Sequence, residues 1–184
     1  DDVGVAQARR AAAMLAGLGP HSIICSDLRR TRQTAEPLAE LTGLEVTLDP
    51  GLRETAAGEW EGKTRPELLA QYGDDMARWA ADVDMRAGVS GETRLVAAIE
   101  RGLASVPADG VLVVVTHGGS ARAAIGRLLQ LPPANWAALG VLTNCSWTVL
   151  LQNDQRFGPP WRLQEYNAGS LPEPVPVDGV WPAD

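Results

Sequence analysis

Cysteine and histidine are both scarce in this chain, which has two of each among its 184 residues. Cys25 and Cys145 each adjoin an apolar run typical of a strand, so we expect two buried free thiols that behave as small hydrophobic side chains. Two cysteines in a chain of this length do not make a disulfide framework. The sequence also lacks a Cys/His cluster with metal-ligand spacing, so it predicts no structural zinc site.

Long apolar runs and concentrations of positive charge are missing as well. No run approaches the ~20 apolar residues that a membrane span needs, so we expect no membrane partner. The net charge is −7 and the basic residues are scattered, which argues against a nucleic-acid partner. This balance still allows an anionic small substrate, because local charges govern a pocket.

The chain opens on Asp1 and not on a methionine. We interpret this as a sign of processing or of a fragment of a longer protein, in which case a signal peptide would lie out of view. The expected location is the cytoplasm.

Hydrophobic residues make up 45% of the chain and charged residues 21%, which is typical of a globular protein. We expect one domain over residues 1–169 and an extended, proline-rich tail over residues 170–184. Strand patterns alternate with helix patterns, which predicts an α/β fold of three layers, with a mostly parallel sheet between helices on both faces. The expected strands lie at 22–26, 44–49, 111–115, 145–153 and 161–167. The expected helices lie at 8–18, 28–41, 64–73, 99–106 and 121–131.

Three details of these elements can be predicted further. Pro37 lacks a backbone donor, so we expect a kink or break over residues 33–36. The continuous aliphatic run at 111–115 predicts the most buried strand of the sheet. In the first helix, apolar residues at helical spacing predict the inward face, and these are Ala8, Ala11, Ala12, Leu15 and Leu18.

Side chains able to bind a phosphate gather where the expected strands end. Ligands of open α/β sheets bind beyond the carboxyl ends of the strands. Arg29, Arg30 and Arg32 follow the first strand, Arg53 and Glu54 follow the second, and His117 follows the run at 111–115.

After His117, two glycines allow a ligand to approach the backbone, and the next helix offers its amino-terminal amides to an anion. An arginine, a histidine and helix amides predict a phosphate site, and a carboxylic acid there could protonate a leaving oxygen. Each residue also has a plainer interpretation. The arginines are compatible with a solvated helix face, His117 with a structural role and Glu54 with an ordinary loop position.

Several segments together resemble the histidine phosphatase superfamily, whose members include phosphoglycerate-mutase-like phosphatases. The similar segments are "VGVAQA", "SDLRRTRQTA", "LRETAAGEWEG", "SGET" and "VTHGG". Their order and spacing match over essentially the whole chain. The late stretches "LPPANWAALGVLTNCSWTVL" and "WRLQEYNAGS" are most similar to members that act on a sugar-linked phosphoglycerate.

The resemblance implies a role for each matching residue. Arg30 would grip the phosphoryl oxygens, and His117, followed by Gly118, would stay protonated and hydrogen-bond them. Glu54 would be the general acid, and Glu92 and Thr93 would line or support the pocket. No metal or cofactor is implied. The partner would be a small phosphorylated metabolite, and a homodimer stays open.

The sequence departs from this family at one place. The family's nucleophile is a histidine in an Arg-His-Gly motif at the end of its first strand, and this chain contains no Arg-His-Gly. We therefore expect an N-terminally truncated copy that is inactive without the upstream histidine. The missing first strand would lie between 111–116 and 146–151, so these two strands are not expected to pair directly.

The predicted activity is hydrolysis of phosphomonoesters through a phosphohistidine intermediate, in the complete form. A phosphoglycerate-mutase-type phosphotransferase is an alternative, but the stretch 55–64 is short and has no tyrosine. A non-catalytic module that binds phosphorylated metabolites is another, supported by the absent nucleophile. For a sugar substrate, Trp60, Asn135, Trp136 and Asn144 are candidate wall residues, and packing is the competing interpretation for Trp136 and Trp147.

Overall fold

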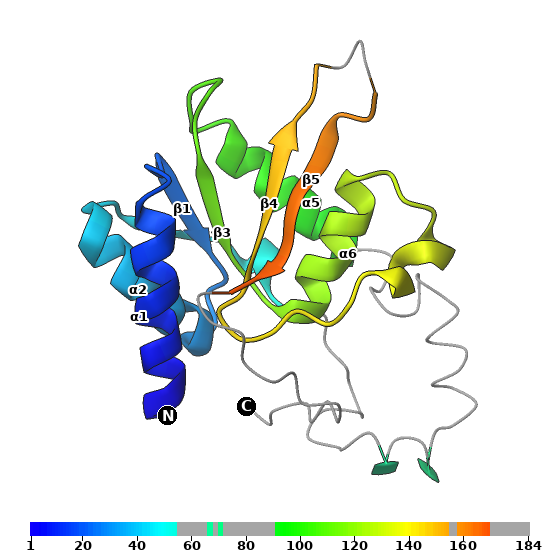
Figure 1. The fold of residues 1–184 in the computed structure, drawn as a ribbon, viewed down its shortest axis with the longest axis horizontal. Helices are drawn as coiled ribbons and strands as arrows, with labels where there is room; N and C mark the ends of the chain where they lie inside the picture. The colour runs from blue at the N-terminus through cyan, green and yellow to red at the C-terminus, as the bar shows by residue number, and fades with distance from the viewer. Residues whose placement is uncertain (55–65, 68–69, 72–90, 155–157, 170–184) are drawn as a thin grey trace.

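The computed structural model describes residues 1–54, 66–67, 70–71, 91–154 and 158–169. The helices are α1 (Asp2–Ala16), α2 (Arg29–Thr42), α5 (Gly91–Leu103) and α6 (Gly118–Leu128), with 3₁₀ turns η1 (Pro50–Leu52) and η3 (Pro133–Ala138). The strands are β1 (Ser22–Cys25), β2 (Val46–Leu48), β3 (Leu112–Val115), β4 (Trp147–Gln152) and β5 (Trp161–Ala168). Figure 1 shows α1 and α2 on one side of the sheet and α5 and α6 on the other, which confirms the three-layer α/β prediction.

The main sheet has the order β2-β1-β3, and both pairings are parallel. β1 therefore has a neighbour on each edge, and Ile23, Ile24 and Cys25 are almost fully buried. The prediction that 111–115 is the most buried strand was wrong, because all four residues of β3 are only half-buried. Among the described strands β3 pairs only with β1, so its position in the sheet limits its burial despite its apolar sequence.

Alternating side chains of β1 supply the two halves of the core. Ile23 and Cys25 pack against Ala12 of α1 and against Ala35 and Leu38 of α2. On the opposite face, Ile24 belongs to a second cluster with residues of η1, α5 and α6, namely Leu52, Leu95, Ala98 and Ala124. The sheet is thus fixed between two apolar layers, and its carboxyl edge is held in place.

Two helices differ from their predicted form. α2 runs without a break through Pro37, so the predicted break does not occur; a proline removes one backbone donor, and the rest of the helix is kept by burial of Thr31, Ala35 and Leu38. α1 ends at Ala16, and Leu18, predicted to face inward, lies beyond the helix with 51% of its surface exposed.

α6 begins at Gly118, three residues before the predicted start, so its first turn directly follows His117. It ends at Leu128, near Gln130, whose φ is +54°. The early start places the amides of the first turn next to the histidine, and the first N–H groups of a helix have no acceptor within the helix itself.

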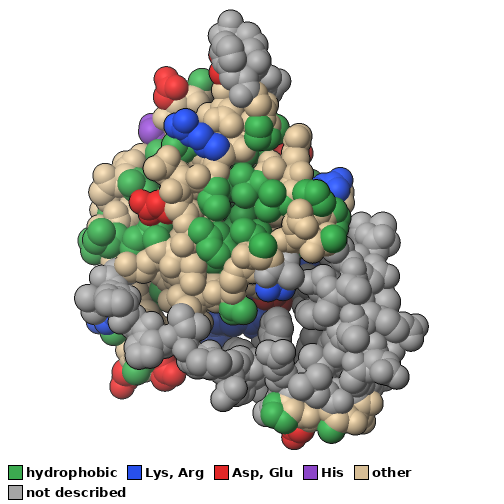
Figure 2. Space-filling model, turned by 45° about the vertical axis from the view of Figure 1, so that its right-hand side comes forward, with side chains coloured by type: hydrophobic (Ala, Val, Ile, Leu, Met, Phe, Trp, Pro, Cys, Tyr) green, Lys and Arg blue, Asp and Glu red, His purple; other side chains and the backbone are tan. Residues whose placement is uncertain are grey.

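β4 and β5 form a separate antiparallel pair. As expected, no ladder joins β3 to β4 in the described part of the chain. The pair is only partly covered, because Leu163 of β5 is exposed. Figure 2 shows hydrophobic side chains gathered on one face of the molecule. A short hydrogen bond from the Tyr166 hydroxyl to the Gly140 carbonyl ties β5 to the segment before β4.

Some predictions lie outside the described residues. These are most of the helix at 64–73, the proline-rich tail at 170–184, and Trp60. Of the helices that are described, none is long and apolar enough to cross a membrane.

Candidate active site

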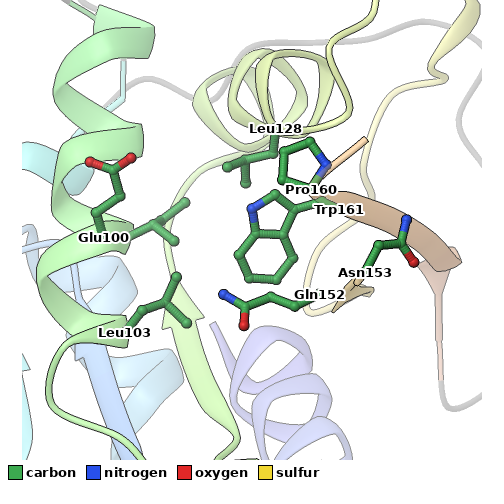
Figure 3. A pocket seen from close by; sticks show the side chains of 8 residues that line it. Glu100, Leu103, Leu128, Gln152, Asn153, Pro160 and Trp161 are labelled. Carbon is green, nitrogen blue, oxygen red and sulfur yellow. The ribbon is translucent and has the colours of Figure 1, made fainter. Parts of the chain in front are cut away.

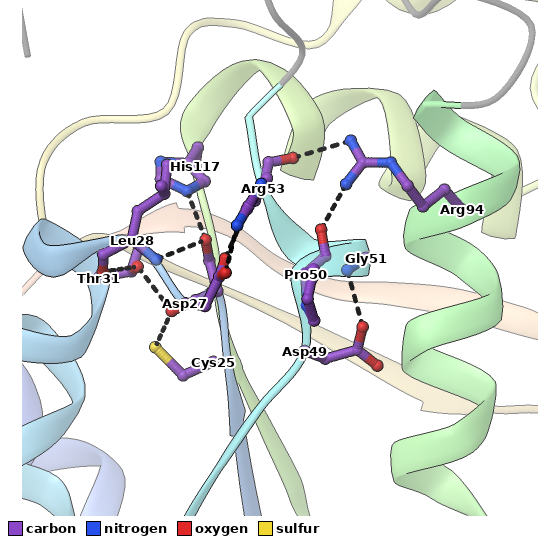
Figure 4. Close-up of polar contacts among 11 residues, drawn as sticks. Cys25, Asp27, Leu28, Thr31, Asp49, Pro50, Gly51, Arg53, Arg94 and His117 are labelled. Atoms are coloured by element: carbon purple, nitrogen blue, oxygen red, sulfur yellow. Dashed lines mark hydrogen bonds and ion pairs between the residues drawn. The ribbon is translucent and has the colours of Figure 1, made fainter.

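The carboxyl ends of β1, β2 and β3 meet at one edge of the sheet. The ladder extends one residue beyond the strands, because the Ser26 amide donates to the Val115 carbonyl at 2.9 Å and the Asp49 amide donates to the Cys25 carbonyl at 2.9 Å. Ser26, His117 and the turn that leads to Glu54 consequently start from the same edge, where ligands of open α/β sheets bind. Figure 4 shows this cluster.

His117 is the N-cap residue of α6 and is buried, with 8% of its surface exposed. Its Nε2 lies 3.0 Å from Oγ of Ser26, which is itself fully buried. The Leu28 amide donates to the same Oγ at 3.4 Å. The imidazole ring is therefore held by a hydroxyl that the chain fixes at the end of β1. Ser26 had no predicted role, although it is the serine of the "SDLRRTRQTA" segment.

The carboxylate of Glu54 lies against the first turn of α6. The Gly119 amide donates to Oε2 at 3.1 Å, the Ser120 amide donates to Oε1 at 2.8 Å, and the Ser120 hydroxyl donates to Oε1 at 2.7 Å. The prediction that amides after His117 bind an anion needs a correction, because the anion they bind is the side chain of Glu54. This contact brings Glu54 and His117 to the same turn of the chain.

The backbone before Glu54 is fixed from two sides. Arg53 forms a two-pronged ion pair with Asp27, at 2.7 Å from Nε and 2.5 Å from Nη2. This hydrogen-bonded guanidinium lowers the pKa of the Asp27 carboxyl below its ordinary value. On the other side, Arg94 of α5 donates to the Pro50 carbonyl at 2.6 Å and to the Arg53 carbonyl at 3.2 Å. Arg94 and Asp27 were not predicted, because no local pattern links three segments so far apart.

The other predicted residues lie around the same edge. Arg30 is in the first turn of α2 and is exposed. Thr93 is exposed in the first turn of α5, and Glu92 precedes it in that turn. Gly118 is the first residue of α6.

Of the candidate sugar-binding residues, Trp60 lies outside the described residues. Trp136 is 4% exposed, donates to the Leu131 carbonyl at 3.0 Å and packs against Gly126, which agrees with the packing interpretation. Asn135 and Asn144 are exposed. Trp147 donates to Glu165 of β5 at 3.2 Å.

The second histidine lies at the opposite edge of the sheet. His21 precedes β1, where its amide donates to the Val111 carbonyl at 2.8 Å and its Nδ1 accepts from the Val111 amide at 3.2 Å. It cannot reach His117, which follows the far end of β3.

A pocket of about 220 Å³ also lies away from His117, between the carboxyl-terminal half of α5, Leu128 of α6, and Trp161 and Gln152 of the β4–β5 pair (Figure 3).

Both cysteines are free, as predicted, although only Cys25 is fully buried. Burial raises the pKa of the Cys25 thiol from 9.0 to about 11. Within the described residues, no group of three or more His, Cys, Asp or Glu side chains is arranged to hold a metal ion.

Comparison with known proteins adds independent findings. The family model described as histidine phosphatase superfamily (branch 1) matches residues 1–168. The chain is 39% identical to glucosyl-3-phosphoglycerate phosphatase of Mycobacterium tuberculosis, over 92% of the chain and 83% of that protein. A solved structure of mycobacterial glucosyl-3-phosphoglycerate phosphatase with inorganic phosphate has a TM-score of 0.82 at 37% identity, over 92% of this chain and 87% of that one. A probable phosphoglycerate mutase of Yersinia enterocolitica is 36% identical, over 78% of the chain and 69% of that protein.

Proposed function

The chain belongs to the histidine phosphatase superfamily, and its phosphatase relatives support a phosphoric monoester hydrolase, for which we propose that Glu54 is the general acid. The observation that carries this proposal is the set of three hydrogen bonds that ties the Glu54 carboxylate to the first turn of α6, directly after His117. The contact holds a proton donor beside the buried imidazole at the carboxyl edge of the sheet, where the substrate's bridging oxygen would lie.

The remaining residues divide the work of binding the phosphoryl group. We assign Arg30 to the phosphoryl oxygens, because a guanidinium presents paired donors that match them. His117 donates to the same oxygens from its protonated ring, while Ser26 holds that ring in place. Gly118 begins α6 and Thr93 lies in the first turn of α5, and we assign both to support of the phosphoryl group.

The proposed reaction has two steps. A histidine nitrogen attacks phosphorus, the bond to the bridging oxygen breaks, and the Glu54 carboxyl gives its proton to the leaving alkoxide. Water then attacks the phosphohistidine while Glu54 takes back a proton, which releases inorganic phosphate.

The nucleophile is a separate question. The sequence has two histidines, and His21 lies at the far edge of the sheet from His117. We therefore propose that these 184 residues supply phosphoryl binding and acid catalysis, and that turnover requires a further histidine as the nucleophile. The test compares p-nitrophenyl phosphate hydrolysis by the 184-residue chain and by a polypeptide carrying a strand that ends in Arg-His-Gly ahead of Asp1. We expect turnover only in the second. Turnover by both would overturn this assignment, and binding of phosphate with turnover by neither would favour the non-catalytic alternative.

Glu54 is tested in the polypeptide that turns over. p-Nitrophenolate leaves readily without a proton, whereas an alkoxide does not, so Glu54→Gln should lower kcat/KM about 10²–10⁴-fold for an alkyl phosphate and much less for p-nitrophenyl phosphate. Equal losses on the two substrates would remove Glu54 from the acid role.

For the substrate, we propose a phosphorylated sugar–glycerate metabolite such as glucosyl-3-phosphoglycerate. Support comes from the 39% identity to a glucosyl-3-phosphoglycerate phosphatase over nearly the whole chain. Comparison of kcat/KM for glucosyl-3-phosphoglycerate, 3-phosphoglycerate and p-nitrophenyl phosphate checks this: the first should exceed the others by tenfold or more. Mutase activity would appear as 2-phosphoglycerate formed from 3-phosphoglycerate.

Two free thiols support a cytoplasmic location, where thiols stay reduced.

A further inference from the structure

We infer that Ser120 is a positioning residue for Glu54, an inference that rests on the role proposed for Glu54. Ser120 is the third residue of α6 and only 4% of its surface is exposed. Both of its polar donors face the carboxylate: the amide at 2.8 Å and the hydroxyl at 2.7 Å, each to Oε1.

The amide contact uses a donor that the helix itself leaves unused. The first amides of an α-helix have no acceptor in the preceding turn, so they bind side chains or water. Here the amides of Gly119 and Ser120 are directed to the two oxygens of one carboxylate. They fix the plane of the carboxylate relative to the axis of α6.

The hydroxyl contact adds a second constraint. Oγ of Ser120 lies 2.7 Å from Oε1 of Glu54 and 3.1 Å from the carbonyl oxygen of Arg53. A hydroxyl carries one proton, so it donates to one of these acceptors at a time, and the shorter distance favours the carboxylate. One side chain thus touches both the backbone that delivers Glu54 and the carboxylate at its end.

An alanine at position 120 could not supply the hydroxyl that donates to Oε1 of Glu54. Without the hydroxyl, Oε1 keeps only the amide donor, and the carboxylate can turn away from the amides of the helix. The loss would be felt at the Gly119 amide, which donates to the other oxygen, Oε2. Exchange of the Gly119 amide therefore reports on the position of the carboxylate.

Hydrogen exchange of the Gly119 amide tests the inference in the 184-residue chain, without any need for turnover. An amide in the first turn of a helix exchanges quickly unless a side chain accepts its hydrogen bond. Ser120→Ala should speed exchange at Gly119 about tenfold, the effect of weakening one charge-assisted hydrogen bond. Ser120→Thr, which keeps the hydroxyl, should restore slow exchange.

A double-mutant cycle separates positioning from a merely structural role. Glu54→Ala should speed exchange at Gly119 by itself, and Ser120→Ala should then add nothing, because the carboxylate on which it acts is gone. Exchange at Leu95 and Ala124, in the core, verifies that each variant is folded. Unchanged exchange at Gly119 in Ser120→Ala, or an effect that persists in the Glu54→Ala background, would overturn the inference. These exchange rates do not depend on catalysis. If only the proposed function fails, the double-mutant cycle at Gly119 keeps its expected result, while Glu54→Gln lowers kcat/KM equally for the alkyl phosphate and for p-nitrophenyl phosphate.

Discussion

Gly119→Ala is the sharpest perturbation that the site offers. A Cβ at this position would lie 3.0 Å from Oε1 of Glu54 and 3.3 Å from its Cδ and Oε2, closer than most Cβ contacts. The carboxylate would have to move away, weakening hydrogen bonds to a charged acceptor that are worth about 1.5–3 kcal/mol each. The same substitution gains up to about 1 kcal/mol, since alanine favours a helix over glycine. A comparison with the wild type would therefore mix two opposite effects.

Gly118→Ala is the matched control. It makes the same change one residue earlier in the helix, but its Cβ would meet nothing closer than the Leu142 carbonyl at 3.5 Å, an ordinary contact. The difference between the two variants isolates the clash with Glu54, and we expect Gly119→Ala to be less stable than Gly118→Ala by about 1.5 kcal/mol or more. For a domain of this size that corresponds to a melting temperature lower by at least about 3 °C.

Thermal unfolding followed by circular dichroism measures this difference. Melting temperatures within about 1 °C of one another would refute the reasoning, since the carboxylate would then not be held against Gly119. In a Glu54→Ala background the difference should disappear, because the side chain that receives the clash is absent. A difference that survives there would place its cause in the helix and not in the carboxylate.

Three other predictions concern the surroundings of the site. Because its pKa is raised to about 11, Cys25 should have a thiolate population about 100-fold below that of a thiol whose pKa is 9.0. A Cys145→Ser variant, which keeps Cys25, should therefore react slowly with a disulfide reagent while folded and faster once unfolded. Fast reaction of the folded variant would contradict the burial of Cys25. Gly126→Ala should cost about 1–3 kcal/mol in urea unfolding, because its Cβ would lie 2.6 Å from a tryptophan indole nitrogen; a neutral change would mean that the indole moves freely. Arg53 lowers the pKa of Asp27, so the ion pair stabilises the fold when the pH is above 3.8, the ordinary pKa of the group, and this stabilisation is lost as the pH falls below that value. The difference in melting temperature between wild type and Asp27→Asn should therefore shrink on acidification, and a constant difference would contradict the pairing.

The sequence predicted the strands well and their burial less well. Apolar runs identified β1 and β3 equally, yet among the described strands of the main sheet only β1 has a neighbour on each edge, and Ile23, Ile24 and Cys25 are buried. The burial of a strand depends on its pairing partners, and those are set by residues far away in the chain. The unbroken helix through Pro37 has a similar origin, because buried side chains on either side of the proline outweigh one lost donor.

The candidate site shows the same division. The positions of Glu54, Arg30 and His117 after the strands could be predicted from the sequence, and the roles given to them by the resemblance stay predictions. Ser26 and Ser120 could not be predicted, because a serine hydroxyl has no local signature and its role depends on what lies 66 or 91 residues away. The amides after His117 were expected to bind a phosphate and instead bind the carboxylate of Glu54, because spacing alone does not reveal which side chain a distant segment brings to them.

The contacts that build the site also have a consequence for how the protein refolds. They join residues 26 apart for Asp27 and Arg53, 66 apart for Glu54 and Ser120, and 91 apart for Ser26 and His117. Closing the longest of these loops costs about 1 kcal/mol more than closing the shortest, and contacts between distant segments form slowly. The helices should therefore recover before the phosphate site does. In a freshly diluted sample, a variant that only folds slowly would be mistaken for one with a damaged active site.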